Sequence, residues 1–85
     1  MKEFTYVLTD ENGIHARPAG MLVKQAGKFS SQIKVTKGEK SADVKRLFAL
    51  MGLAAKKGDT LKFTVEGEDE DVAAEEVKKF LEANL

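Results

Sequence analysis

The residues of this 85-residue chain that are best suited to chemistry lie in one stretch, residues 13–19 (GIHARPA), which holds the only histidine and the only proline. Pro18 predicts a helix that begins at about Ala16, because proline is tolerated in the first turn, where main-chain N–H groups have no partner within the helix. His15 then stands at the start of this helix, where the free N–H groups and the positive end of the dipole favour an anion and a neutral imidazole. Arg17 adds a planar guanidinium that suits oxyanions. The stretch predicts a phosphate site beside a nucleophilic histidine.

A lone histidine is often structural or merely exposed, and the residue alone leaves that alternative open. Other chemistries fit the sequence poorly. The chain has no cysteine, which excludes zinc clusters, disulfides and thiol catalysis, and one histidine without a carboxylate at ligand spacing does not complete a metal site. A hydrolytic triad lacks its nucleophile elbow, and the aromatic residues do not alternate with basic ones as they do in nucleic-acid platforms. We therefore expect a covalent acceptor that needs no cofactor and binds no nucleic acid.

Composition indicates one soluble globular domain over residues 1–85, with 42% hydrophobic and 33% charged residues. Neither a signal peptide nor a membrane span is visible, so we expect a cytoplasmic protein with no membrane insertion. The net charge is zero, but residues 12–62 carry eleven Lys or Arg and three Asp or Glu, whereas residues 63–85 carry two and eight. This asymmetry favours anionic ligands or acidic protein surfaces around His15, unless the lysines only solvate the faces of helices and strands.

Hydrophobic periodicity predicts seven elements in the order β-α-β-β-α-β-α. They are a strand at 4–9, a helix at 16–29, strands at 32–36 and about 40–43 joined by a glycine hairpin, a short helix at 46–53, a strand at 60–66 and a helix from about 68 to 83. Residues 10–13 break the first strand. Because helical crossovers must assemble the sheet and amphipathic helices must cover one face, the fold class is an α/β open-faced sandwich.

The short helix at 46–53 is too apolar for its length, since Leu47, Phe48, Leu50, Met51 and Leu53 surround most of its circumference. We expect one or two of these side chains to be exposed. The alternative, in which the domain buries all of them, stays open.

The acidic run at 68–71 suggests a cation site or, as the favoured interpretation, the first turn of the last helix, where acids complement the dipole and cap the amides. On the outer face of that helix, Glu75 and Lys79 predict an i,i+4 ion pair.

Residues 13–19, the helix that follows them and the Lys45-x-Leu47 pattern in the second helix closely resemble HPr, the family of histidine-containing phosphocarrier proteins of the phosphoenolpyruvate-dependent sugar phosphotransferase system. The resemblance spans essentially the whole chain and implies a four-stranded antiparallel sheet with three helices on one face. It also implies that His15 accepts phosphate on Nδ1 from phosphorylated enzyme I and passes it to enzyme IIA of a sugar transporter. Arg17 would contact the phosphate, in a binding region formed by Ala16, Arg17 and Pro18. Such a carrier is not a turnover enzyme, and a monomer is expected.

The resemblance further assigns a docking surface to this chain. Leu47, Phe48 and Met51 would form its apolar part. Basic residues beside them would face acidic rims on both partners, namely Arg17, Lys24, Lys28 and Lys45.

Arg46 departs from the family pattern, because many relatives carry there a serine that a regulatory kinase modifies in Gram-positive bacteria. Without a hydroxyl, this modification is impossible. Arginine is also a poor N-cap, at a cost of about 1 kcal/mol unless Asp43 or water supplies an acceptor. Our hypothesis is that Arg46 strengthens binding to an acidic partner. The alternative function is a regulatory phosphoprotein that uses His15 to signal nitrogen or carbon status.

Overall fold

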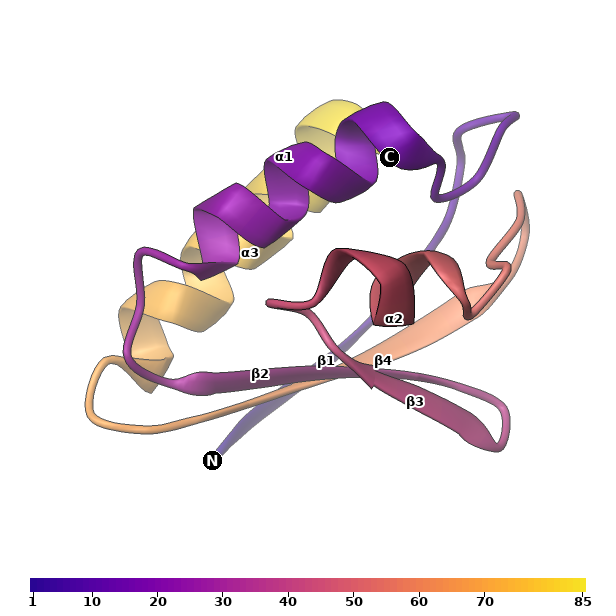
Figure 1. The fold of residues 1–85 in the computed structure, drawn as a ribbon. Coiled ribbons are helices and arrows are strands. Elements are labelled where there is room, and N and C mark those ends of the chain that lie inside the picture. The colour runs from indigo at the N-terminus through magenta and orange to yellow at the C-terminus, as the bar shows by residue number, and fades with distance from the viewer.

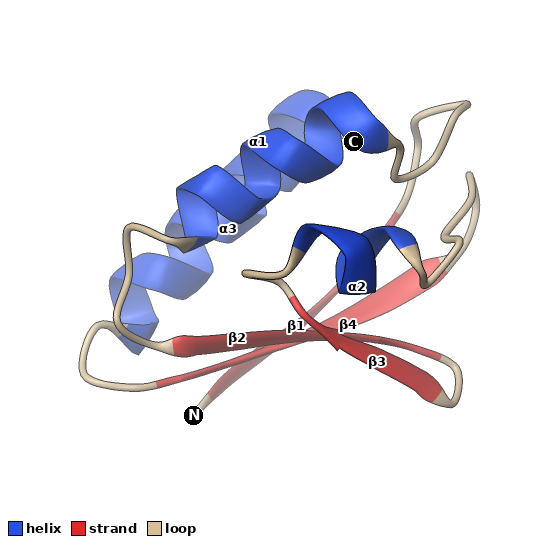
Figure 2. Ribbon diagram, in the orientation of Figure 1, coloured by secondary structure: helices blue, strands red, loops and turns tan.

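The computed structural model describes all residues, 1–85, and contains four strands and three helices (Figures 1 and 2). In chain order they are β1 (Lys2–Val7), α1 (Ala16–Ala26), β2 (Gln32–Lys37), β3 (Lys40–Asp43), α2 (Leu47–Met51), β4 (Thr60–Glu66) and α3 (Glu70–Asn84). The predicted element order is confirmed. None of these helices has the length and apolar character needed to cross a membrane.

The strands form one sheet in the order β1-β4-β2-β3, and every neighbouring pair is antiparallel. All three helices lie on one face of this sheet, with α1 and α3 next to each other and the short α2 between α1 and β3 (Figure 1). The predicted open-faced sandwich is therefore confirmed, including the four-stranded antiparallel sheet that the family resemblance implied.

The core lies between the sheet and the helices. On β4, Leu61, Phe63 and Val65 are buried and alternate with polar residues, as the period of two in the sequence predicts. The same holds for Ile33 and Val35 on β2. The helices add their own apolar stripes, which on α3 are Ala73, Val77 and Leu81. A small domain of this kind gains most of its stability from this layer.

The first strand lies two residues earlier than the sequence predicts. Lys2 and Glu3 pair with β4, whereas Thr9 leaves the sheet because its N–H donates to the main-chain oxygen of Leu85 at 2.8 Å. The N–H of Asp10 donates to the same oxygen at 2.9 Å, and the Thr9 hydroxyl donates to it at 2.8 Å. The strand therefore ends where its chain begins to cap the last turn of α3.

The first helix ends at Ala26, three residues before the predicted end, and Phe29 lies in the turn that follows. The carboxylate of Asp69 accepts hydrogen bonds from the N–H groups of Ser30 and Ser31, each at 2.9 Å, and from the Ser31 hydroxyl. These bonds hold the pKa of the Asp69 carboxyl below its usual value, with the Ser31 hydroxyl as the largest cause. Asp69 thus fastens the α1–β2 turn to the start of α3.

The acidic run at 68–71 holds the fold together through separate partners. Besides Asp69, Glu70 lies 2.8 Å from the amino group of Met1, and Asp71 lies 3.1 Å from Lys2 Nζ. The amino group lowers the pKa of Glu70, and Glu70 in turn raises the pKa of the amino group. The interpretation of this run as the start of the last helix is confirmed, since Glu70 and Asp71 lie in the first turn of α3, but the expected capping of its amides by these side chains is wrong. The predicted pair of Glu75 and Lys79 is present at 3.3 Å.

The second helix is shorter than predicted and has no side-chain cap. Arg46 stands at its N-cap with extended φ and ψ. Asp43 supports the turn before the helix instead, since its Oδ1 accepts the N–H of Lys45 and its main-chain oxygen accepts the N–H of Arg46. The expected exposure of an apolar side chain is confirmed at Phe48, which is 86% exposed.

Candidate functional site

The loop that carries His15 is fastened to the segment after α2. The N–H of Ile14 donates to the main-chain oxygen of Ala55 at 3.1 Å, and the Ile14 side chain is buried. Gly13 has φ +64°, and a Cβ there would lie 2.2 Å from the Ala55 oxygen. Only glycine fits this close approach, which fixes the position from which the chain enters α1.

His15 is the N-cap residue of α1, with φ −116° and ψ 177°. Its main-chain oxygen accepts the N–H of Ala19 at 2.9 Å, but its side chain caps no helix amide. The imidazole therefore stays available, with 43% of the side chain exposed. The N–H groups of Ala16 and Arg17 donate to no main-chain oxygen, so the start of α1 offers two free donors beside the ring.

An open hollow of about 250 Å³ brings the predicted site residues together. Its lining comprises His15, Arg17, Pro18, Met21 and Asn84. The ion pairs of the chain do not involve Arg17, so its guanidinium is free for a ligand. Pro18 is buried and contributes the start of the helix rather than a donor. The arrangement suits an oxyanion on an exposed imidazole.

Asp10 faces His15 and was missed by the sequence analysis. Its Oδ2 lies 3.4 Å from Nε2 of the imidazole. The signal was present in residues 10–13, which we interpreted only as a break after the first strand. An aspartate that begins a turn directs its carboxylate back toward the residues that follow, and here the histidine comes two residues after the turn ends.

The residues assigned to docking divide into two groups. Phe48 points into solvent, whereas Leu47 and Met51 are half-buried and pack against the core. Lys24, Lys28 and Arg46 are all exposed.

Lys45 differs from these basic residues, because its Nζ donates to the main-chain oxygen of Phe29 at 2.7 Å. Its ammonium thus serves the turn after α1 and is not free at the surface.

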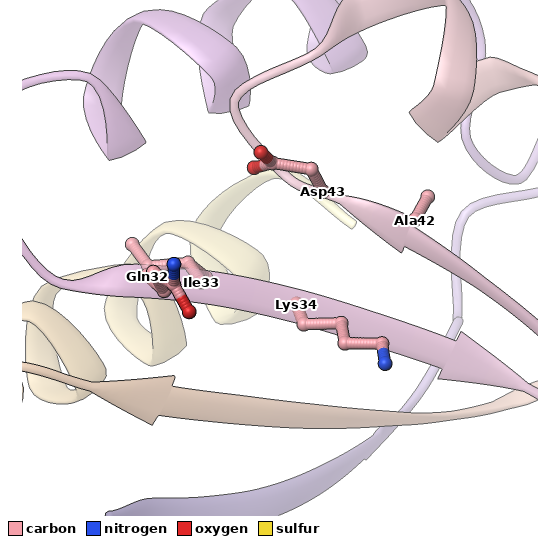
Figure 3. A pocket seen from close by; sticks show the side chains of 5 residues that line it. All are labelled: Gln32, Ile33, Lys34, Ala42 and Asp43. Carbon is pink, nitrogen blue, oxygen red and sulfur yellow. The ribbon is translucent and has the colours of Figure 1, made fainter.

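A second hollow, of about 260 Å³, lies between β2 and β3 (Figure 3). Its lining includes Lys34 and Asp43, which are cross-strand partners. Figure 3 shows their side chains pointing apart, so they present no converging polar groups to a ligand. We take the smaller hollow at His15 as the candidate site, since it alone combines a nucleophile, a free cation and free amides.

Comparison with known proteins identifies the family of this chain. A family model described as the PTS HPr component phosphorylation site matches residues 2–83. A phosphocarrier protein HPr from Lysinibacillus sphaericus is 46% identical over 81 residues, which are 95% of this chain and 92% of that protein.

Among solved structures, an HPr from Thermoanaerobacter tengcongensis is 38% identical and has a TM-score of 0.93, with coverage of 98% of this chain and 93% of that chain. Crh of Bacillus subtilis, described as a catabolite repression protein that forms a swapped dimer, is 29% identical with a TM-score of 0.79, and the match covers 94% and 92%.

The fold and the site define a class of small open-faced sandwiches that carry one exposed histidine at the start of their first helix. The family model matches nearly the whole chain, and the relatives are similar to it over most of their length. It belongs to the PTS-HPr family, the phosphocarrier proteins of the phosphotransferase system.

Proposed function

We propose that His15 accepts a phosphoryl group from phosphorylated enzyme I and passes it to enzyme IIA of a sugar transport system. The observation that carries this proposal is the open hollow in which the exposed imidazole of His15 and the unpaired guanidinium of Arg17 lie together. The membership in the PTS-HPr family supports the same chemistry. The chain would be a carrier that is altered in each half-reaction, and not a turnover enzyme.

The transfer requires little from the carrier beyond position and charge. The lone pair of Nδ1 attacks phosphorus in line, and the bond from phosphorus to the donor nitrogen breaks and leaves its electron pair on the donor. Arg17 and the free N–H groups of Ala16 and Arg17 would stabilise the charge on the phosphoryl oxygens. Because the hollow is open, enzyme IIA can reach the same phosphorus in the second transfer step.

Docking would use the exposed ring of Phe48 as the apolar anchor, with Lys24, Lys28 and Arg46 as a basic surround. Aromatic side chains that become fully desolvated carry much of the affinity of protein interfaces, and surrounding charges mainly set the association rate. If Arg46→Ser leaves both the affinity for the partner and its salt dependence unchanged, the role proposed for Arg46 is refuted.

The carrier function is tested by incubating the chain with phosphoenolpyruvate and enzyme I and recording phosphorus NMR. The wild type should give one acid-labile phosphohistidine signal, and His15→Ala should give none. Arg17→Ala should keep its fold and lose most of the rate. An unlabelled wild type, or full labelling of His15→Ala, rejects the proposal.

A regulatory phosphoprotein is the second candidate, and the structural likeness to Crh favours it. Both functions use phosphorylated His15 and differ in the next step. Addition of enzyme IIA to the purified phosphorylated chain separates them: rapid loss of the phosphohistidine signal supports transport, whereas a stable signal supports signalling.

We also propose that the chain acts as one domain and as a cytoplasmic monomer. A dimer is a real alternative, because one solved relative is described as an HPr dimer from Thermoanaerobacter tengcongensis. Sedimentation equilibrium over a wide concentration range tests this, and a mass of about twice 9.3 kDa at micromolar concentration would refute the monomer.

A further inference from the structure

We propose that Asp10 is the positioning residue of the site: its carboxylate holds His15 in the tautomer that carries its proton on Nε2. Nδ1 then keeps its lone pair and is the nucleophile. This inference rests on the proposed function of His15 as a phosphoryl acceptor, and it adds the residue that selects the reactive nitrogen.

Asp10 is itself firmly held. Its N–H donates to the Leu85 main-chain oxygen at 2.9 Å, and its own main-chain oxygen accepts the N–H of Gly13 at 3.0 Å. Its Oδ2 accepts the N–H of Asn12 at 3.2 Å. The turn therefore fixes the orientation of the carboxylate independently of His15. A side chain that positions another must itself be held in place in this way.

The contact with His15 is distinctive among the ion pairs of this chain. Oδ2 of Asp10 lies 3.4 Å from Nε2, slightly beyond the usual range of an N–H···O hydrogen bond. The other ion-paired carboxylates face a lysine or the amino group of Met1, whereas the ion-pair partner of Asp10 is the imidazole. A carboxylate accepts and cannot donate, so it favours a proton on the nitrogen that faces it.

This choice of tautomer matters for the transfer step. If the proton sat on Nδ1, that nitrogen would have no lone pair and the proton would have to leave before a bond to phosphorus could form. With the proton on Nε2, the Nδ1–P bond forms and the bond to the donor breaks without any proton leaving the ring. The phosphorylated ring gains a positive charge, which the negative carboxylate of Asp10 stabilises.

Asp10 should also protect Nε2 from reaction. A phosphoryl donor carries negative charge, and a carboxylate 3.4 Å from Nε2 repels it at that edge of the ring. The preferred tautomer and the electrostatic repulsion at Nε2 therefore both favour phosphorylation at Nδ1.

A purely structural role for Asp10 is the main alternative, because the residue also builds the turn. Asp10→Asn distinguishes the two. Oδ2 of Asp10 both accepts the Asn12 N–H and faces Nε2, and the amide keeps the size of the side chain and an oxygen acceptor for the turn while it removes the negative charge that favours a proton on Nε2. Glu11→Gln is the matched control, because it removes a neighbouring exposed charge that forms no ion pair.

The deciding measurement is nitrogen NMR of the imidazole in the free chain, at a pH where the ring is neutral. The wild type should show a protonated Nε2 and an unprotonated Nδ1. In Asp10→Asn the ratio of the two tautomers should fall by up to about fivefold, which is the range expected for an exposed charged contact. Glu11→Gln should leave it unchanged. An equal ratio in the wild type and Asp10→Asn overturns the inference.

Phosphorylation by enzyme I gives the second readout. In Asp10→Asn the initial rate should fall by up to the same factor of about five, and phosphate should become detectable on Nε2. Phosphate on Nδ1 alone, at an undiminished rate, also overturns the inference. Because the tautomer is measured without any partner, a wild type that is never phosphorylated refutes the proposed function, and the NMR ratio still decides the role of Asp10.

Discussion

Replacement of Gly13 by alanine tests whether the close approach of the His15 loop to Ala55 is what fixes the site. Gly13 and Gly38 have nearly the same main-chain conformation, with φ +64° and +59°. A Cβ on Gly13 would lie 2.2 Å from the Ala55 oxygen, whereas a Cβ on Gly38 would meet nothing within 4 Å. Gly13→Ala and Gly38→Ala thus share the strain of a positive φ, and only Gly13→Ala adds a steric clash between the new Cβ and the Ala55 oxygen.

The expected magnitudes follow from this difference. A left-handed conformation destabilises alanine by about 1–2 kcal/mol, and the lower entropy of the unfolded chain offsets about 0.5–1 kcal/mol of this. Gly38→Ala should therefore lower the free energy of unfolding by about 0.5–1 kcal/mol. Gly13→Ala should lower it by about 2–4 kcal/mol, because the Ile14–Ala55 hydrogen bond and part of the burial of Ile14 are lost as well.

Urea unfolding followed by circular dichroism measures both values, and thermal melts should separate the variants by roughly 5–20 °C for a chain of this size. Folded Gly13→Ala should also be phosphorylated more slowly than Gly38→Ala, since its loop is displaced. Equal destabilisation of the two variants would show that the contact with Ala55 contributes little to stability, and would refute the claim that this contact fixes the position of His15.

Three further perturbations give distinct results. Ala54 has φ +53°, so Ala54→Gly should raise the free energy of unfolding by about 0.5–1 kcal/mol in urea titrations; no gain would mean that this conformation carries no strain. The lowered pKa of Asp69 means that its contribution to stability is present above the ordinary pKa of aspartate, about 4, and is lost as the pH falls below it. The unfolding midpoint of Asp69→Asn should accordingly vary less with pH in this range than that of the wild type. An equal pH dependence of the two midpoints would contradict the role of Asp69 in fastening the α1–β2 turn to α3. Phe48→Ala should change stability by less than about 0.5 kcal/mol yet weaken binding to enzyme I about tenfold or more, as measured by calorimetry, whereas Val72→Ala, an exposed apolar residue on α3, should leave binding unchanged.

Much of the fold follows from local patterns. The alternation in β4 and the three- and four-residue spacing in α1 are properties of short segments, so the sequence predicts these elements and their buried faces well. The element boundaries depend on distant partners. β1 ends where Thr9 turns to cap α3, and the turn after α1 is shaped by Asp69, which lies about forty residues further along the chain.

The candidate site shows the same division. His15, Arg17 and Pro18 are adjacent in sequence, and their types already predict an oxyanion beside a nucleophile. The position of Asp10 depends on a turn and on the end of α3, so only the structure reveals its contact with the ring. Likewise, the sequence marks Lys45 as a basic docking residue, but its ammonium donates a hydrogen bond to the main-chain oxygen of Phe29.

The two attachments of the His15 loop also have a consequence for synthesis and folding. The loop is held by Ala55 on one side and by Leu85 on the other, residues that lie about 40 and 75 positions away from their partners. Such distant contacts form late, because the entropy of closing long loops must be overcome first. An emerging or partly folded chain that lacks α3 has the same histidine but not the oriented ring. We therefore expect His15 to be phosphorylated more slowly on such a chain than on the folded one, so that the donor transfers phosphoryl groups mainly to completed carriers.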